Sequence, residues 1–306
     1  MANSTLLQLV SRTMQGMGVA TSGLPSTVID NANNDVVQTL ALVNMEGDAL
    51  AREYEWQAQR LQNIFEATYF QYTGDVTSGS TTIANMSSIV SLDETFMVVG
   101  AGIPQNTLVV SAAGTDVVID REPDATDTTV TLNFSKVRFA FPSDFDRIID
   151  KTNWSTTDRW EMLGPSSPQE FAWLKSGYIS TGPRVRFIQF GNYFQIWPPQ
   201  GVAKWLQFDY ISKNWIYATA GTAVSKQVFT VDTDTCMFPD ALMYALIRLK
   251  YFEVKGFDTT SLSRDYETQR DLAKSHDGGS PDLNMAPRLG DVLLTGSNIP
   301  DSGYGT

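Results

Sequence analysis

The chain of 306 residues contains one cysteine and one histidine, and this scarcity excludes several kinds of chemistry. Cys236 cannot form an internal disulfide, so we expect folding in a reducing compartment and a small buried thiol at this position. A nucleophile needs a base, and the only histidine, His276, lies in a stretch rich in Gly, Ser and Asp. Phosphate-binding loops are also missing, because Gly100-Ala101-Gly102 lacks a third glycine and no Gly-Lys-Ser/Thr occurs. We therefore expect no catalysis and no cofactor.

Basic residues and long apolar runs are scarce as well. The 22 Lys and Arg residues stand against 34 Asp and Glu, which gives a net charge of −12. A surface that grips DNA needs Lys and Arg to neutralise phosphates, so this charge fits a surface past which nucleic acid slides. The apolar run Leu6 to Val10 is too short for a secretory signal, and no run approaches the roughly 20 residues that span a bilayer. We expect a soluble protein without a membrane segment.

Helical spacing of apolar residues occurs at both ends of the chain. It predicts a helix over 4–17 and a longer one from about Ile29 or Asn31 to Glu66, in which Gly47 costs about 1 kcal/mol relative to Ala. After Pro239, which suits a first helical turn, it predicts one helix that ends at Gly256 and another over 261–274. These helices predict one bundle built from residues 1–72 and 236–275.

The residues between the helical ends have β character. The block 73–135 consists of short β-runs separated by turn residues, and its eight acidic residues and one basic residue give a net charge of −7. This abrupt shift predicts an inserted small β-domain. Residues 136–235 predict a central antiparallel β-domain, sandwich or barrel-like, with strands over 136–141, 184–190, 193–197 and 205–210. The predicted fold class is therefore α+β.

Two groups of carboxylates could carry chemistry. Asp120, Glu122, Asp124 and Asp127 have a spacing similar to that of calcium loops, but the tight-turn glycine is missing, so a solvated acidic loop is favoured. Pairs for glycoside cleavage meet only in three dimensions, so they stay open. The candidates are Asp144 and Asp146 beside Arg147, and Glu161 or Glu170 near tryptophans.

Tryptophans and arginines offer two further candidates. Trp154, Trp160 and Trp173 could stack on sugars, although packing within a β-domain or an interface is the favoured interpretation. Arg184 and Arg186 alternate with apolar residues, so we expect both on one side of a strand. The polar face of a strand is the default interpretation, and a salt bridge at a subunit interface is the functional alternative.

Several short motifs in the middle of the chain resemble a known family. They are 141-Phe-Pro-Ser-Asp-Phe-145, Trp154, Gly164-Pro165 to Trp173-Leu174, Gly191-Asn192-Tyr193, Trp197-Pro198 and 208-Phe-Asp-Tyr-Ile-Ser-Lys-Asn-Trp-215. With Leu6 to Val10 and the closing helical pair, this pattern resembles the head–tail adaptor subunits (connector or tail tubular type) of tailed bacteriophages. The resemblance covers residues 1–72 and 136–275, whereas the block 73–135 is not part of the family's minimal pattern.

The resemblance implies a structural virion protein at the head–tail junction, assembled in the cytoplasm of the bacterial host. It implies a homo-oligomeric ring, usually of twelve copies, that binds beneath the portal protein and extends the DNA channel. DNA would pass without sequence-specific binding, and the ring would be the platform for a downstream tail or nozzle protein. Two alternatives stay open, a tail-associated glycan- or receptor-binding protein and a virion-borne polysaccharide hydrolase.

The C-terminal residues 276–306 are rich in Gly, Pro, Ser and Asp, so they cannot bury enough surface to order themselves. The resemblance implies that this segment is a docking arm for the portal. Its apolar residues are the proposed anchors: Leu283, Met285, Leu289, Val292, Leu293 and Leu294.

Overall fold

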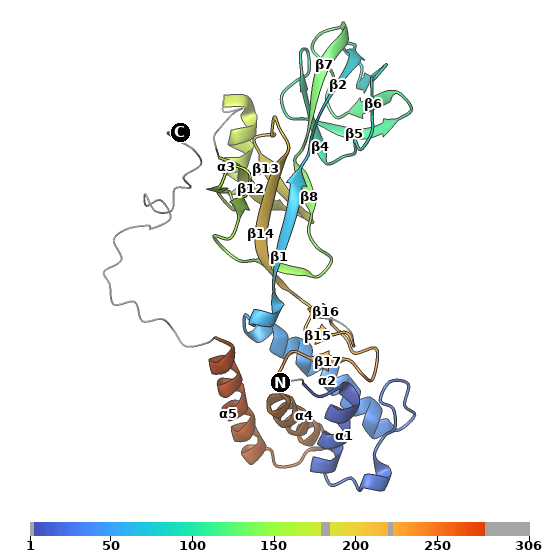
Figure 1. Ribbon diagram of the computed structural model, residues 1–306, viewed down its shortest axis with the longest axis vertical. Coiled ribbons are helices and arrows are strands. Elements are labelled where there is room, and N and C mark those ends of the chain that lie inside the picture. Colours follow the sequence, from blue (N-terminus) through green and yellow to red (C-terminus); the bar gives the residue numbers. More distant parts are fainter. Residues whose placement is uncertain (1–2, 179–183, 220–222, 279–306) are drawn as a thin grey trace, which may run out of the picture. The chain divides into compact units, whose positions relative to one another are not determined.

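The computed structural model describes residues 3–178, 184–219 and 223–278 (Figure 1). Within these residues five α-helices accompany antiparallel sheets, so the predicted α+β class is confirmed. The chain forms two units. The helical unit contains the described residues of 1–61, 144–148 and 210–306, and the β unit contains those of 62–143 and 149–209.

Helices α1 (Leu6–Gly16) and α2 (Asn34–Glu53) begin at side-chain caps and bury one apolar face each. Thr5 and Gln8 form a capping box at the start of α1, and Asn33 Oδ1 accepts from the Asp35 amide at the start of α2. A short 3₁₀ turn, η1 (Thr21–Gly23), lies between them. The buried face of α1 consists of Leu6, Leu9, Val10, Thr13 and Met14.

The prediction that the second helix reaches Glu66 was wrong. Helix α2 ends at Glu53, because Tyr54 turns to an extended conformation with φ −143° and ψ 156°. The buried Trp56 donates from Nε1 to the Leu50 carbonyl over 3.1 Å, and this satisfies one of the last carbonyls of the helix. A 3₁₀ turn, η2 (Gln57–Gln59), then leads into the strand β1 (Arg60–Ala67).

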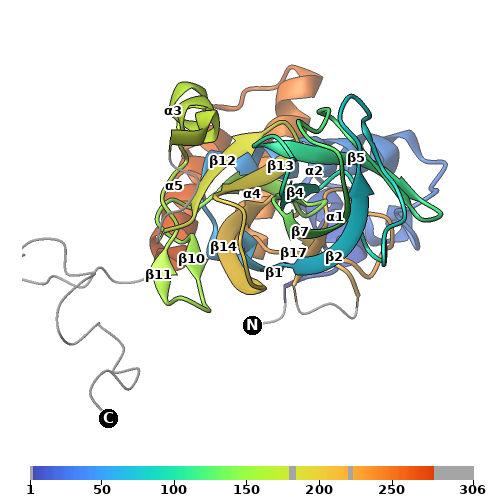
Figure 2. The ribbon, with the colours of Figure 1, turned by 90° about the horizontal axis from the view of Figure 1, so that it is seen from above.

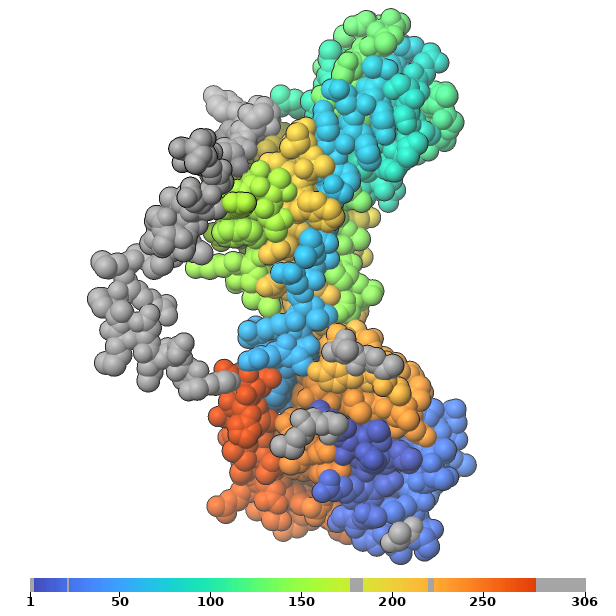
Figure 3. Space-filling model, in the orientation of Figure 1, coloured from blue at the N-terminus to red at the C-terminus, as the bar shows by residue number. Residues whose placement is uncertain are grey.

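Helices α4 (Asp240–Lys255) and α5 (Thr260–Asp277) complete the helical unit. Figure 3 shows the atoms of α1 and α2 (blue) against those of α4 (orange). The apolar core of this unit joins α1, α2 and α4 to Trp215 and Phe238. Helix α4 ends at Gly256, which takes a left-handed conformation with φ 76°, as the sequence predicted.

A small three-stranded sheet also belongs to the helical unit: β15 (Ile216–Tyr217), β16 (Val224–Lys226) and β17 (Thr235–Cys236). The fully buried Asp234 accepts from Lys226 Nζ at 2.7 Å and from the amides of Thr230 and Val231. Its own carbonyl accepts from the Leu6 amide, so this carboxylate and its backbone fix both the loop and the start of α1.

The β unit contains a six-stranded antiparallel sheet in the order β2-β7-β4-β5-β6-β3. Its first strand β2 (Tyr69–Val76) pairs with its last strand β7 (Asp127–Lys136), so the chain enters and leaves this sheet on adjacent strands. Apolar side chains such as Phe96, Val109, Leu132 and Phe134 form its core. The other strands are β3 (Thr82–Ile83), β4 (Phe96–Gly100), β5 (Thr107–Ala113) and β6 (Asp116–Ile119).

The other strands and one helix complete the β unit around a cluster of phenylalanines. Phe187 and Phe194 stack at 4.8 Å, and Phe194 stacks on Phe208 at 5.1 Å. Helix α3 (Pro168–Trp173) lies beside β12 in both Figure 1 and Figure 2, and the π-helical turn η3 (Leu174–Tyr178) continues it. One sheet has the order β12-β13-β8, with β12 (Arg186–Phe190), β13 (Tyr193–Trp197) and β8 (Arg138–Ala140). A second has the order β1-β14-β10-β11, with β14 (Lys204–Ser212), β10 (Trp154–Ser155) and β11 (Trp160–Glu161). The strand β9 (Phe145–Ile148) belongs to the helical unit and pairs there with the end of β14, over residues 210–212.

The borders of these units differ from the predicted segments: the β unit begins at Gln62, and residues 144–148 of the predicted central β-domain lie in the helical unit. The six-stranded sheet starts at Tyr69, within the segment 1–72 that the sequence assigned to the helical bundle. The described residues of 210–235 also lie in the helical unit, although the sequence grouped them with the central β-domain. The reason is that Trp215 and Ile216 pack into the helical core, and their apolar character alone does not reveal which core they join.

Candidate functional site

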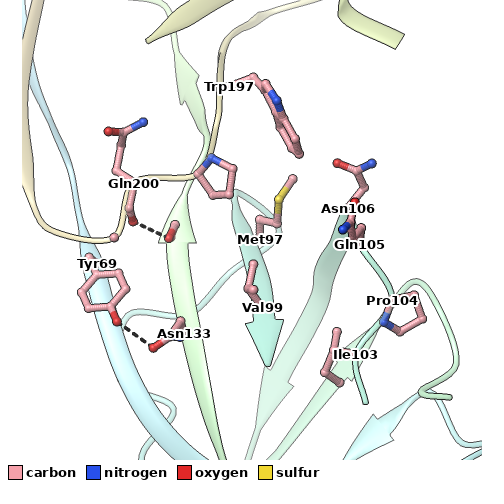
Figure 4. Close-up of a pocket in the computed structure, with 13 residues that line it drawn as sticks. Tyr69, Met97, Val99, Ile103, Pro104, Gln105, Asn106, Asn133, Trp197 and Gln200 are labelled. Carbon is pink, nitrogen blue, oxygen red and sulfur yellow. Dashed lines mark hydrogen bonds between the residues drawn. The ribbon is translucent and has the colours of Figure 1, made fainter. Parts of the chain in front are cut away.

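A pocket of about 320 Å³ lies between the six-stranded sheet and the segment that follows β13 (Figure 4). Met97, Val99 and Ile103 form an apolar wall, and Trp197 lies across from them. Tyr69 donates its hydroxyl to Asn133 Oδ1 at 2.6 Å, so this polar pair at the rim is satisfied within the chain. An apolar concavity with a few polar groups suits an apolar side chain or a small ligand.

The two arginines proposed for a subunit interface have partners within the β unit. Arg186, at the start of β12, forms an ion pair with Glu170 of α3. The guanidinium of Arg184 lies 5.2 Å from the ring centroid of Trp160. Arg184 precedes β12, so the two arginines do not lie on one strand as the sequence predicted.

Tryptophans divide into buried and exposed sets. Trp56, Trp197 and Trp215 are buried in the cores, whereas Trp160, Trp173 and Trp205 expose about half of their surface, between 45% and 52%. Trp154 is intermediate. The exposed rings are available to a partner, and Trp205 is one that sequence reasoning missed.

Trp205 belongs to an exposed apolar face on the sheet that contains β1 and β14. Gln62 of β1 bonds to Asp209 of β14, so these two side chains lie on one face. Alternate residues of a strand share a face, which places Ile64 (53% exposed) and Trp205 (52% exposed) on it as well. Trp154 pairs with Gln207 and adds to the same face. The alternation in Trp205-Leu206-Gln207-Phe208 indicates this exposed face, because Leu206 and Phe208 are buried on the opposite face.

The carboxylates considered for glycoside cleavage have structural partners. Asp144 accepts from Ser212 Oγ at 2.7 Å and from the Tyr210 hydroxyl at 3.1 Å. Burial, together with the charge of Asp144, raises the pKa of Tyr210 to about 12. Asp146 lies 3.6 Å from Arg147. These contacts hold β9 against β14 and do not assemble an acid–base pair.

The acidic loop considered for calcium forms turns of the six-stranded sheet. Asp120 Oδ1 accepts from the Leu108 amide at 2.7 Å, and Asp127 Oδ1 accepts from the Thr128 amide at 2.8 Å. In the part of the chain that the structure describes, no three His, Cys, Asp or Glu side chains are grouped so that they could hold a metal ion.

Cys236 is buried as the sequence predicted, with 1% of its surface exposed. Burial raises the pKa of its thiol to about 12. A thiol in this environment is protonated at neutral pH and is a poor nucleophile.

The proposed portal anchors Leu283, Met285, Leu289, Val292, Leu293 and Leu294 lie outside the described residues. Among the helices that the structure describes, none is long and apolar enough to cross a membrane.

Comparison with known proteins identifies a family. Residues 103–277 match the family of SU10 adaptor proteins, and this match covers more than half of the chain. It begins in the six-stranded sheet, just before β5, and extends to the end of α5. No curated protein matches the chain. The matched residues include β12–β14 and both C-terminal helices, so the chain belongs to the SU10 adaptor protein family, whose members are structural adaptors of phages.

Proposed function

We propose that this chain is the ring-forming subunit of a phage head–tail adaptor, which binds beneath the portal, extends the DNA channel and holds the next tail component. The family match over residues 103–277 carries this proposal. The net charge of −12 supports a channel that does not retain DNA, because like charges repel the phosphate backbone.

An exposed apolar stripe on α2 supports a contact between neighbouring subunits. Val37 and Met45 expose 49% and 61% of their surface, and the exposed Ala41 lies midway between them. Residues four apart share a helix face, so the three form one stripe. In a closed ring each subunit presents two different faces to its neighbours, and we assign this stripe to one of them.

The exposed face of Trp205 and Ile64 belongs to the β unit, and we assign it to contact with another virion protein. A patch rich in Trp is typical of the centre of a protein interface. In this proposal the six-stranded sheet is an inserted module. Its first strand β2 pairs with its last strand β7, so the chain enters and leaves the sheet at neighbouring points.

The C-terminal segment 276–306 is the proposed docking arm for the portal, with the six apolar residues named above as anchors. A segment that orders on binding loses conformational entropy, and repetition around a ring compensates for this through avidity.

The test is to mix the purified chain with portal protein and measure the particle mass, followed by electron microscopy. We expect rings of the full chain that bind portal, and rings of a chain lacking 279–306 that do not. Met45→Glu should prevent ring formation, whereas Val90→Glu, at a residue of the β unit that is 68% exposed, should not. A chain that stays monomeric beside portal, or a truncated chain that binds portal fully, refutes the corresponding part of the proposal.

The half-exposed Trp160 and Trp173 favour glycan binding as the second candidate function. Glycan-array binding that disappears in Trp160→Ala, with the far-UV circular dichroism spectrum unchanged, supports this alternative. An empty array with the intact protein excludes it for the glycans tested.

A further inference from the structure

A second hollow in the β unit, of about 540 Å³, lies between the turn before β5, the end of β6 and the end of α3. It is lined by two cations, Arg121 and Lys175, and one carboxylate, Asp120. The volume is in the range of small-molecule sites and exceeds what a bare ion fills. None of these residues has a role in the proposed adaptor function.

The cations of this hollow lack partners of opposite charge. Among the described residues neither Lys175 nor Arg121 forms an ion pair, and the same holds for Arg138 nearby. Arg121 Nη1 donates to the Gln105 carbonyl at 2.9 Å, which orients the guanidinium at the rim and leaves other N–H groups for a ligand. In a chain with a net charge of −12, unpaired cations in one hollow indicate a site for an anion.

Lys175 lies deeper, with its ammonium 4.8 Å from the ring centroid of Phe171. Burial lowers the pKa of Lys175 to about 8, and the charges of Arg138 and Arg121 add to this effect. A bound anion would offset both causes, because it replaces lost solvation and neutralises the neighbouring positive charge.

Asn106 lines this hollow and also the pocket beside Trp197. Its side-chain Nδ2 donates to the Lys175 backbone carbonyl, so it holds the turn before β5 against η3. Its Oδ1 is buried, and Figure 4 shows this oxygen on the side of Trp197. The groups that a ligand in the hollow would meet are therefore Lys175 and Arg121.

Asp120 limits the charge of the ligand. Its Oδ1 accepts from the Leu108 amide, and its negative charge opposes part of the charge of Arg121 and Lys175. The balance of two cations and one carboxylate suits a single phosphate group better than a polyphosphate.

We propose that this hollow binds a small molecule that carries one phosphate group, of which a sugar phosphate is the simplest class. The phosphate lies between Lys175 and Arg121. Apolar contacts come from Pro104 and Ala172.

The test is calorimetric titration of the full chain with ribose 5-phosphate, inorganic phosphate and ribose. We expect ribose 5-phosphate to bind most tightly and inorganic phosphate next. Ribose lacks the charged group and should bind at least about 10-fold more weakly than ribose 5-phosphate. A DNA oligonucleotide without terminal phosphates tests whether the backbone phosphates of nucleic acid are the ligand instead. It should show no binding that depends on Lys175.

Three variants assign the contacts. Lys175→Met keeps the apolar stem on Phe171 without the charge, and it should weaken ribose 5-phosphate binding about 10- to 100-fold, whereas Lys175→Arg retains binding. Arg121→Gln, at an exposed rim position, should weaken binding in the same direction and tests the site even if Lys175→Met does not fold.

The matched control is Lys136→Met, because Lys136 also lies over an aromatic ring of the β unit, 5.8 Å from Phe139, and is not part of the hollow. It should bind like the unaltered chain. Equal binding by the folded Lys175→Met and Arg121→Gln variants overturns the proposal, as does equal affinity for ribose and ribose 5-phosphate, or no binding of any phosphate.

Discussion

Replacing Gly47 by alanine should destabilise the protein, although alanine is the better helix former. Gly47 lies in the middle of α2, and the buried indole of Trp215 packs directly against it. A Cβ atom at residue 47 would lie closest to Trp215 Cη2, and it would be only 2.6 Å from Cζ2 and 2.8 Å from Cζ3. Real Cβ atoms essentially never approach other atoms below 3.0 Å, so the indole or the helix must move.

The two opposing effects can be compared. Alanine gains about 1 kcal/mol over glycine in a helix interior, and overpacking of a core costs about 1–3 kcal/mol. Three indole atoms are too close and Trp215 has no free space, so the cost should fall in the upper part of that range. We expect Gly47→Ala to lower the free energy of unfolding by about 1–2 kcal/mol.

Urea unfolding followed by circular dichroism at 222 nm measures this change, because most helical residues belong to the helical unit. Gly16→Ala is the matched control. A Cβ there meets Arg248 Cδ at an ordinary 3.6 Å, so the variant should be neutral or slightly stabilised. A gain of about 1 kcal/mol in Gly47→Ala would refute the packing argument, since only helix propensity would then operate.

A double-mutant cycle with Trp215→Phe isolates the contact. Trp215 Nε1 is buried and has no hydrogen-bond partner among the described residues, so phenylalanine removes ring volume without breaking a hydrogen bond. The Gly47→Ala substitution should cost less in the Trp215→Phe background, with a coupling energy of about 0.5–3 kcal/mol. Strict additivity would show that the two residues do not compete for space.

Three further predictions concern the helical unit. Asp234→Asn breaks the buried pair with Lys226 and should cost about 3–5 kcal/mol at neutral pH. Burial favours a higher pKa for Asp234, but its hydrogen bonds lower the pKa overall. The difference in stability between Asp234→Asn and the unaltered chain should therefore shrink as the pH falls below about 4, and a constant difference in acid titration would contradict this. The thiol of Cys236 should not react with Ellman's reagent at pH 8 until urea unfolds the chain, and rapid reaction of the native protein would disprove its burial. Thr5→Ala removes the capping box with Gln8 and should lower stability by about 1 kcal/mol in thermal unfolding, whereas Thr5→Ser should change little.

The end of α2 shows where the sequence stops predicting the fold. No glycine or proline occurs between Gly47 and Gly74, so none of the usual stop signals is present. The apolar residues Leu61 and Ile64 continue a helical spacing that a strand can also accommodate. The helix ends because the indole of Trp56 reaches the Leu50 carbonyl inside a core shared with Phe238, and this contact depends on residues far apart in the chain. The β character of the block 73–135 was predicted correctly, since its turns are marked by local residues.

The candidate sites were less predictable because each brings together distant segments. Arg186 was proposed for a subunit interface, but its partner Glu170 comes from a helix whose position relative to β12 no local pattern specifies. Asn106 and Lys175 are 69 residues apart, and neither has an unusual local sequence. The exposed face of Trp205 could have been predicted from the sequence, since strand alternation places Trp205 on the face opposite to Leu206 and Phe208.

The six-stranded sheet bears on how the family match should be interpreted. The match begins at residue 103, yet β5, β6 and β7 are hydrogen-bonded to β2, β3 and β4 in a single sheet. Residues 69–102 contain β2, β3 and β4, and β4 pairs with both β5 and β7. Removing these residues would leave β5 and β7 with unpaired edges, which are prone to aggregation. A chain that begins at the start of the match should therefore not fold. Excision of the whole sheet, from Tyr69 to Lys136, leaves two chain ends that lie close together and can be rejoined, because the first strand β2 pairs with the last strand β7. The pairing of β2 with β7 thus marks where this sheet begins and ends, and the boundary of sequence similarity at residue 103 does not mark a boundary of structure.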